Sequence, residues 1–184
     1  EPDWIIAIDA DELYEADKMK EHLPHIMAQT QADWVGFRFY DMWDDEQHYR
    51  DDDIWPAGNG YAPRMFRVKP DIKYEFANVR RHCGSIPSNV LKNPGLNSPI
   101  RVKHLGWMKP DDRDKKFLDR TVDDPNNEFF PQEVYDAILD ERPNLVEWYD
   151  NNPWQTGKMT IAYPPGMEWN IMQQRPHHLL KLAA

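Results

Sequence analysis

The feature that most constrains this chain is a short apolar run, Trp4-Ile5-Ile6-Ala7-Ile8, that passes directly into Asp9-Ala10-Asp11-Glu12. An apolar run of this length, bounded by polar residues, is typical of a buried strand and is too short for a helix of its own. Carboxylates at the end of such a strand lie at the rim of a sheet, where open α/β folds bind ligands. Their oxygens suit a hard divalent cation that also binds phosphate. The run therefore predicts a strand that ends in a metal site.

Length, charge and cysteine content limit the class of protein. The 184 residues suffice for one sizeable domain, or for one domain and a piece of another. The formal net charge of −10 argues against nucleic acid as a partner, and an acidic protein needs a cation to bind a nucleotide diphosphate. Cys83 is the only cysteine, which excludes a disulfide framework. No apolar run reaches the length of a transmembrane segment. We therefore expect a cytoplasmic protein, or one peripheral to the inner face of the membrane.

Apolar periodicity outlines further elements of an α/β fold. Residues 17–31 have the apolar spacing of a helix, with Asp17 as the expected N-cap. Residues 34–40 alternate as a strand does, and shorter alternating runs at 64–68 and 100–104 predict two more strands. Between the predicted strands at 34–40 and 64–68, residues 41–60 lose all periodicity. We call this segment the excursion.

The excursion mixes tryptophans with acids, including Asp44, Asp45 and Asp52 beside Trp43 and Trp55. Long ordered loops on α/β domains tend to be functional. Ring faces for stacking and carboxylates for hydroxyl groups are what a sugar-binding site needs. A solvated acidic loop with a few anchoring aromatics explains the same composition equally well, and the residues alone leave both interpretations open.

The Asp9-Ala10-Asp11 motif, with the apolar run before it and Glu12 after it, resembles the DxD motif of family 2 glycosyltransferases with the GT-A fold. The resemblance covers residues 4–120 and implies a partial, Rossmann-like GT-A domain with a mixed sheet. It also implies Mn²⁺ or Mg²⁺ bound to the diphosphate of a nucleotide-sugar donor, UDP-linked or similar. The implied reaction is transfer of the sugar, with inversion, to a hydroxyl of a carbohydrate or glycan acceptor.

The resemblance also implies roles for residues far from the DxD motif. The strand at 100–104 ends in His104, which would join Asp9 and Asp11 as the third metal ligand. Imidazole suits Mn²⁺ better than Mg²⁺, so His104 favours manganese. A basic pair shortly after this histidine, Arg113 and Lys116, would contact the diphosphate.

The acceptor side is less sharply defined. His82, Trp43 and Trp55 are the candidate acceptor-side residues. Inversion by direct displacement needs a general base beside the acceptor oxygen. The excursion offers Asp44, Asp45 and Asp52 for that role, and the sequence does not choose among them.

The remaining chain suggests further units. We expect residues 1–122 to form the C-terminal half of a GT-A domain and residues 123–157 a helical linker, with short helices at 131–141 and 144–149. Within the first of these helices, we expect Leu139 to point inward. Residues 158–184, with a strand followed by a helix from Pro176, resemble the first βα unit of a GT-B glycosyltransferase. If so, the chain is a fragment that lacks the nucleotide-binding half, and it is expected to be inactive alone.

Two other functions compete with the glycosyltransferase. A phosphatase of the haloacid-dehalogenase type also places D-x-D at a strand end and would use Asp9 as its nucleophile. Such enzymes usually follow the motif with a small residue, whereas Glu12 and Leu13 stand here. A non-catalytic carbohydrate-binding module would use the tryptophans of the excursion alone. Dependence on a metal ion distinguishes the transferase from the binding module. Dependence on a nucleotide-sugar donor distinguishes the transferase from the phosphatase.

Overall fold

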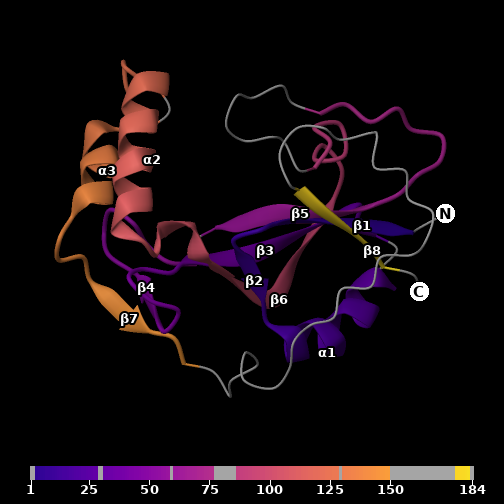
Figure 1. Ribbon diagram of the computed structural model, residues 1–184. Helices are drawn as coiled ribbons and strands as arrows, with labels where there is room; N and C mark the ends of the chain where they lie inside the picture. The colour runs from indigo at the N-terminus through magenta and orange to yellow at the C-terminus, as the bar shows by residue number, and fades with distance from the viewer. Residues whose placement is uncertain are drawn as a thin grey trace.

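The computed structural model describes residues 3–28, 31–58, 60–76, 86–128 and 130–149, together with the backbone of 177–182. The described part is a mixed α/β structure with a mixed β-sheet, as the sequence predicts (Figure 1). The strands of the main sheet are β1 (Trp4–Asp9), β2 (Glu12–Tyr14), β3 (Trp34–Asp41), β5 (Tyr61–Arg67), β6 (Gly95–His104) and β8 (His177–Leu182).

Strand direction brings three strand ends together. The strands lie in the order β2-β6-β3-β5-β1-β8, in which β3 and β6 are parallel and the other neighbours are antiparallel. As a result β1, β3 and β6 run in one direction, and their carboxyl ends lie at the same edge of the sheet. The last residues of these strands are Asp9, Asp41 and His104. The topology therefore gathers acids and a histidine at one edge.

One face of the sheet packs against helix α1 (Ala16–Met27). A helix was predicted here over residues 17–31, but it ends at Met27, and its N-cap is Glu15 rather than Asp17. The carboxylate of Glu15 instead binds the side chain of Arg101 in β6, at 2.7 Å from Nη2. Alternating apolar residues of the strands meet the apolar stripe of α1 in one core cluster, which consists of Trp4, Ile6, Ile8, Tyr14, Met19, Leu23, Ile26, Val35, Phe37, Met65, Ile100 and Val102. This core packs against the strands whose carboxyl ends carry Asp9, Asp41 and His104.

A second core forms where the excursion meets the helices after β6. These elements are η1 (Leu105–Trp107), α2 (Pro110–Asp123), α3 (Gln132–Asp136) and η2 (Ala137–Leu139). Helices α2 and α3 lie side by side at one end of the molecule (Figure 1). The buried residues of this cluster are Trp43, Trp107, Tyr135 and Ile138. Leu139, which we expected to point inward, is 42 % exposed because the helix predicted over 131–141 breaks into α3 and η2.

Three predicted segments have a different structure. The excursion contains a short strand, β4 (His48–Arg50), which pairs with β7 (Leu145–Glu147), so the helix predicted at 144–149 is wrong. The helix predicted from Pro176 is also wrong in its described part, because β8 pairs antiparallel with β1. In both cases the unpaired backbone groups of a neighbouring strand outweigh local helix propensity.

The predicted domain boundaries remain predictions. The predicted strand at 158–163 lies outside the described residues. Within the predicted linker, Tyr135 and Ile138 pack against Trp43 and Trp107. Among the described helices, none has the length and apolar character needed to cross a membrane.

Candidate active site

The site begins with Asp11 and His104, which the fold places face to face. Asp11 lies in the turn between β1 and β2, and its backbone carbonyl accepts a hydrogen bond of 2.7 Å from the N–H of Leu105. In the β2–β6 register, Glu12 is the partner of His104. His104 Nε2 consequently lies 3.4 Å from Asp11 Oδ2. Two ligands of one ion, each about 2.1–2.2 Å from it, are at most about 4.5 Å apart, so this pair can hold one ion.

The other ring nitrogen of His104 contacts Asp41, which the sequence analysis did not assign to the site. Nδ1 lies 2.5 Å from Asp41 Oδ1, and Trp55 Nε1 donates to Asp41 Oδ2 at 2.7 Å. Asp41 is the first residue of the predicted excursion, yet in the structure it ends β3 opposite His104. We call Asp11, Asp41, His104 and Lys116 the strand-end site.

The charges of the strand-end site depend on one another. Burial disfavours the charged imidazole, but the hydrogen bonds with Asp11 and Asp41 outweigh it and raise the pKa of His104 to about 9. Burial acts to raise the pKa of Asp41, but the His104 contact outweighs it and the pKa is lowered. The hydrogen bond with His104 likewise lowers the pKa of Asp11. Without a metal ion, the site is an imidazolium between two carboxylates.

Asp9 has a different environment from Asp11. Arg64 Nη2 lies 4.0 Å from Asp9 Oδ2, and Arg64 Nε donates to Glu12 Oε1 at 2.9 Å. The Tyr14 hydroxyl also donates to Glu12, at 3.1 Å, and burial raises the pKa of Glu12. The two aspartates of the motif therefore have different neighbours: a guanidinium lies beside Asp9, and the imidazole faces Asp11.

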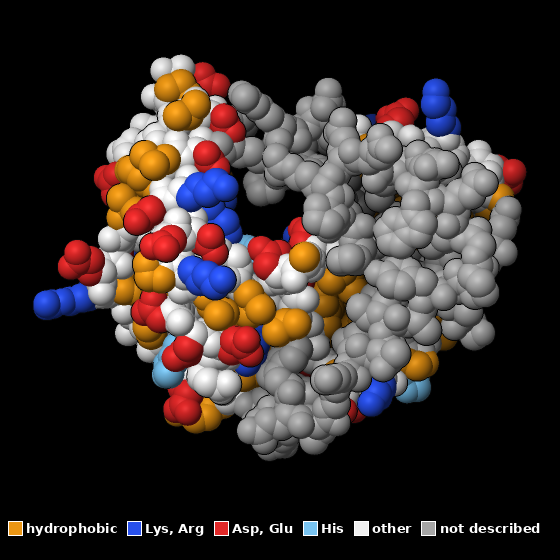
Figure 2. Space-filling model, viewed as in Figure 1, with side chains coloured by type: hydrophobic (Ala, Val, Ile, Leu, Met, Phe, Trp, Pro, Cys, Tyr) orange, Lys and Arg blue, Asp and Glu red, His pale blue; other side chains and the backbone are white. Residues whose placement is uncertain are grey.

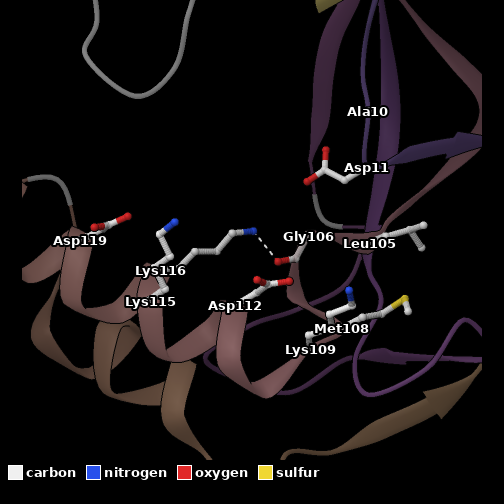
Figure 3. Close-up of a pocket in the computed structure, with 10 residues that line it drawn as sticks. All are labelled: Ala10, Asp11, Leu105, Gly106, Met108, Lys109, Asp112, Lys115, Lys116 and Asp119. Carbon is white, nitrogen blue, oxygen red and sulfur yellow. Dashed lines mark hydrogen bonds between the residues drawn. The ribbon is translucent and has the colours of Figure 1, made fainter. Parts of the chain in front are cut away.

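An open cleft of about 520 Å³ adjoins the strand-end site (Figure 3). Figure 2 shows basic side chains beside a hollow in this face of the molecule. Helix α2 and the residue before it contribute lysines to the cleft. Carboxylates of both the β1–β2 turn and α2 face them, so the cleft carries both signs of charge. The lining residues are Ala10, Asp11, Leu105, Gly106, Met108, Lys109, Asp112, Lys115, Lys116 and Asp119.

Gly106 leaves a small space on which three polar atoms converge. A Cβ at this position would lie 2.6 Å from Asp11 Oδ2, 2.6 Å from Lys116 Nζ and 2.8 Å from His104 Nε2. The ammonium of Lys116 also donates to the backbone carbonyl of Gly106. Burial lowers the pKa of Lys116, while Asp11 and Asp41 oppose that shift. A side chain at position 106 would fill the place where the anion, the imidazole and the ammonium meet.

The donor set fits a cation that is shared with a ligand. Nowhere in the described ranges do three His, Cys, Asp or Glu side chains form a complete metal site. Asp11 and His104 supply an oxygen and a nitrogen, which suits Mn²⁺. Magnesium-type sites in proteins commonly take one or two side chains and complete the shell with water and substrate phosphates. The pair therefore fits an ion bound together with a phosphate ligand.

Of the two predicted diphosphate contacts, only Lys116 lines the cleft. The guanidinium of Arg113 donates to the carbonyls of Trp107 at 2.8 Å and Met108 at 3.0 Å, and to Asp44 Oδ1 at 2.8 Å. Arg113 therefore ties α2 to the excursion.

The three candidate bases of the excursion all bind neighbouring groups of the protein, and none of them lines the cleft. Asp44 pairs with Arg113. Asp45 Oδ1 accepts backbone hydrogen bonds from Gln47 and His48, at 2.7 and 2.8 Å.

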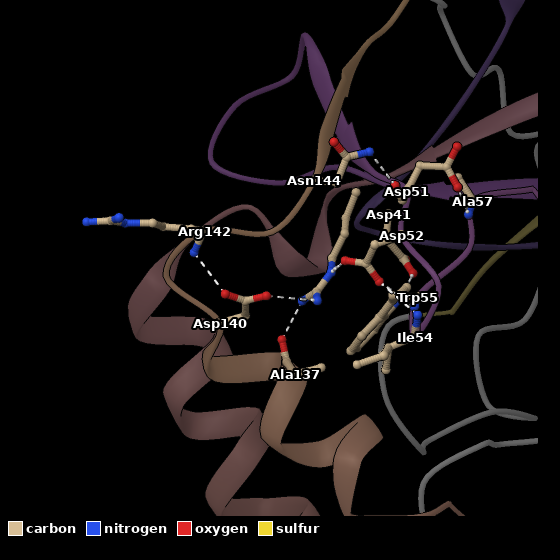
Figure 4. A network of polar contacts seen from close by, with 11 residues as sticks. Asp41, Asp51, Asp52, Ile54, Trp55, Ala57, Ala137, Asp140, Arg142 and Asn144 are labelled. Atoms are coloured by element: carbon tan, nitrogen blue, oxygen red, sulfur yellow. Dashed lines mark hydrogen bonds and ion pairs between the residues drawn. The ribbon is translucent and has the colours of Figure 1, made fainter.

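Asp52 lies in the polar network of Figure 4. Its Oδ2 binds Arg50 Nε at 2.6 Å, and its Oδ1 accepts from the N–H groups of Ile54 and Trp55. Arg50 is 1 % exposed and also donates to the carbonyl of Ala137. Asp52 thus fixes the fold of the excursion.

Of the predicted acceptor-side residues, Trp43 and Trp55 pack against each other, with ring centroids 5.9 Å apart. Trp43 is 0 % exposed, so neither face of its ring is accessible to a sugar. Trp55 is half-buried, packs on Trp107 with ring centroids 4.9 Å apart, and donates to Asp41. His82 lies outside the described residues.

Comparison of the chain with protein-family models, with characterised proteins and with solved structures finds no match. A function can therefore be inferred only from the residues and the geometry of the site. The residue that sequence reasoning missed is Asp41. Its signal was its position: it directly follows the strand predicted at 34–40, and the ends of co-directional strands meet at one edge of a sheet.

Proposed function

We propose that this chain carries the metal- and diphosphate-binding part of an inverting glycosyltransferase of the GT-A type, similar to family 2. The observation that carries the proposal is the 3.4 Å separation of His104 Nε2 and Asp11 Oδ2, with the second nitrogen of His104 held by Asp41. Asp11 belongs to a D-x-D motif at a strand end, and His104 lies far downstream of it in the sequence. Both residues adjoin a cleft with lysines in its wall.

In this proposal Asp11, His104 and Lys116 of the strand-end site hold a metal ion and the diphosphate of a nucleotide-sugar donor. Asp11 and His104 hold Mn²⁺ or Mg²⁺. A bound divalent ion acts as a Lewis acid that offsets the charge building on the leaving diphosphate. Lys116, whose ammonium lies at the same space, provides a second positive charge toward the same oxygens.

The transfer itself requires groups beyond the strand-end site. An acceptor hydroxyl oxygen forms a bond to the anomeric carbon while the bond from that carbon to the diphosphate oxygen breaks. A carboxylate takes the hydroxyl proton. Asp44, Asp45 and Asp52, the bases expected from the sequence, bind other groups of the protein and do not line the cleft. We therefore name Asp112 and Asp119, which line the cleft, as the candidate bases that the geometry favours.

Two observations favour the transferase over the alternatives. A phosphatase of the haloacid-dehalogenase type would use Asp9 as nucleophile, but Asp11 lines the cleft while Asp9 lies beside Arg64. A carbohydrate-binding module built on the excursion would need accessible rings, but Trp43 is buried.

The proposal is tested with Mn²⁺ and inorganic diphosphate as probes, by titration calorimetry on the whole chain. We expect diphosphate to bind in the presence of Mn²⁺ and not in its absence. Asp11→Asn and His104→Gln each remove a ligand, and we expect each to weaken Mn²⁺ binding by roughly 100-fold. Asp17→Asn, at an exposed position in the first turn of α1, is the matched control and should bind as the wild type does. Equal Mn²⁺ affinity in all four proteins would contradict the proposal.

The phosphatase alternative is distinguished from the transferase by the reaction that it would catalyse. A phosphatase releases phosphate from p-nitrophenyl phosphate through an aspartyl-phosphate, and Asp9→Asn would abolish that release. We expect no phosphate release from this chain. Release that depends on Asp9 would replace the proposal with the phosphatase.

A further inference from the structure

Asp41 is held on both of its oxygens. Oδ1 contacts His104 Nδ1 at 2.5 Å, and Oδ2 accepts from Trp55 Nε1 at 2.7 Å. The backbone is fixed at the same place, because the N–H of Met42 donates to the carbonyl of His104 at 2.9 Å. A carboxylate bound at both oxygens cannot rotate without breaking a hydrogen bond.

This arrangement determines which nitrogen of His104 is available. An ionised carboxylate only accepts hydrogen bonds, so Nδ1 must carry the proton that lies between it and Asp41. In the neutral ring, Nε2 then has the free lone pair, and Nε2 is the atom 3.4 Å from Asp11. Metal-binding histidines in proteins commonly donate their other N–H to a carboxylate, which fixes the ring and its tautomer.

Trp55 connects this carboxylate to the second core. Its ring packs edge-on against Trp107 at 4.9 Å and against Trp43 at 5.9 Å between centroids. The N–H groups of Ile54 and Trp55 are held by Asp52, which is itself bound to the buried Arg50. The indole N–H is therefore presented to Asp41 by a packed and hydrogen-bonded loop (Figure 4).

We propose that Asp41 and Trp55 are positioning residues that orient His104, with Asp41 holding the imidazole and Trp55 holding Asp41. This inference rests on the proposed function, in which His104 binds the metal ion. It assigns to the excursion the orientation of a ligand, in place of the sugar stacking expected of Trp55. Neither residue contacts the ion or the donor.

The test measures Mn²⁺ binding and the coordination of the bound ion in the whole chain. Asp41→Asn supplies one acceptor oxygen in place of two, so it cannot satisfy His104 and Trp55 together. We expect Mn²⁺ affinity to fall roughly 10- to 100-fold in this variant. Trp55→Phe keeps the contact between Asp41 and His104 and loses only its support, so we expect a fall of roughly 3- to 10-fold.

Asp51→Asn is the matched control, because Asp51 lies in the same loop but binds the N–H of Ala57 instead. We expect its affinity to stay within about 2-fold of the wild type, as for a site outside the ligand's support.

A spectroscopic readout separates orientation from loss of stability. Electron spin echo modulation of bound Mn²⁺ reports nitrogen from a coordinating imidazole and phosphorus from diphosphate. We expect nitrogen modulation in the wild type and in Asp51→Asn, and a marked decrease in Asp41→Asn, with the phosphorus signal retained. Thermal unfolding of each variant verifies that it is folded. If Asp41→Asn does not fold, Trp55→Phe decides the question by the same two readouts.

The outcomes separate this inference from the proposed function. Wild-type nitrogen modulation that persists unchanged in Asp41→Asn and Trp55→Phe, with unchanged affinity, overturns the positioning role and leaves the proposed function standing. Absence of nitrogen modulation in the wild type removes His104 as a ligand and overturns both. Absence of Mn²⁺ binding in the wild type has the same consequence.

Discussion

The strand-end site and the excursion contain the same kinds of residue, aspartates with aromatic neighbours, and use them differently. At the strand ends, Asp11 and His104 face a cleft in which their polar atoms converge on one small space. In the excursion, Asp52 and Asp45 bind N–H groups and a guanidinium, and Trp43 is buried. From the sequence we predicted a metal site at the strand end, and the excursion was left open between a sugar-binding site and a solvated acidic loop. Geometry assigns ligand binding to the first and support to the second.

The difference comes from how each backbone is constrained. Sheet pairing fixes strand ends in advance, so polar side chains can lie together there without bonding to their own loop. A long loop must satisfy its own backbone groups, and short acidic side chains do this well. Asp44, Asp45, Asp51 and Asp52 consequently bind groups of the protein itself. The comparison predicts that changes in the excursion other than at Asp41 and Trp55, which hold His104, alter stability, whereas changes at the strand ends alter metal binding.

The largest expected effect is on stability. Ile138 is 1 % exposed in the core that joins the excursion to α2 and α3. Ile138→Ala leaves a cavity, and we expect the free energy of unfolding to fall by about 2–5 kcal/mol. Urea unfolding measures this change, and calorimetry on the folded variant should show Mn²⁺ affinity near that of the wild type. A large loss of Mn²⁺ affinity in the folded variant would contradict the view that this core contributes to stability and not to metal binding.

The next effect is the pH dependence of stability without metal. The pKa of His104 is raised from its ordinary value of 6.5 to about 9, because the contacts with Asp11 and Asp41 outweigh burial. A raised pKa stabilises the fold at pH values below 6.5, and that stability is lost as pH rises through about 9. The loss is on the order of 3 kcal/mol and at most that, since the ring is partly exposed.

Urea unfolding at pH 6 and pH 9.5, with and without Mn²⁺, measures this dependence. Metal binding requires the neutral ring, so stabilisation by Mn²⁺ should grow with pH while the metal-free protein weakens. The variant His104→Gln should lose both trends. The same pH dependence in His104→Gln as in the wild type would show that another group is responsible.

Gly106→Ala tests whether the three polar atoms must share one space. The new Cβ would lie within 2.6–2.8 Å of Asp11 Oδ2, Lys116 Nζ and His104 Nε2. These are ends of side chains that can move apart, so we expect the fold to persist. Crowding of about 1–3 kcal/mol corresponds to Mn²⁺ affinity weaker by roughly 5- to 150-fold. Gly60→Ala is the control, since nothing lies within 4 Å of a Cβ there. Unchanged Mn²⁺ affinity in Gly106→Ala would place the ion elsewhere.

Lys116→Met should separate the ion from the anion. The ammonium of Lys116 lies at the space where the metal ion is proposed to bind, so the two cations repel each other. We expect Mn²⁺ alone to bind roughly 2- to 10-fold more tightly to the variant. Diphosphate, in the presence of Mn²⁺, should bind more weakly because a positive charge is gone. Lys18→Met, on the exposed side of α1, serves as control. If both affinities change in the same direction, Lys116 does not have this double role.

The smallest effect is expected at Asp44. Its side chain is 54 % exposed and pairs with Arg113, and its backbone has a φ of 65°. Asparagine tolerates that conformation and keeps an oxygen that can accept from Arg113, whose guanidinium also binds two backbone carbonyls, so the loss of charge is expected to cost about 0–1 kcal/mol. We expect Asp44→Asn to change stability by less than about 1 kcal/mol and Mn²⁺ affinity by less than about 2-fold. A strong loss of Mn²⁺ binding would indicate that Asp44, in the excursion, takes part in binding the metal ion.

Much of the sheet was predictable because its signals are local. The runs around Ile6, Phe37 and Val102 alternate or stay apolar, and each is a strand of the structure. The juxtaposition of Asp11 with His104 was also predicted, although from a family resemblance rather than from periodicity. The strands β4, β7 and β8 were not predicted, because they exist only through pairing with distant segments.

The supporting residues of the site could not be predicted for a similar reason. Nothing in the sequence indicates that Trp55 reaches Asp41, since fourteen residues separate them and the loop path decides the contact. The roles of Arg113 and Lys116 also depend on the helix face that each occupies. Arg113 is buried against Trp107, whereas Lys116 lines the cleft. The family resemblance gave both residues the same role.

The central claim is that one divalent ion binds between Asp11 and His104. The most direct measurement is a crystal structure of the chain with Mn²⁺ and diphosphate, in which anomalous scattering locates the manganese. We predict a single peak about 2.1–2.2 Å from both Asp11 Oδ2 and His104 Nε2, with a diphosphate oxygen completing the coordination. A manganese peak bound elsewhere, or a diphosphate held in the cleft by lysines with no manganese beside Asp11, would contradict the account.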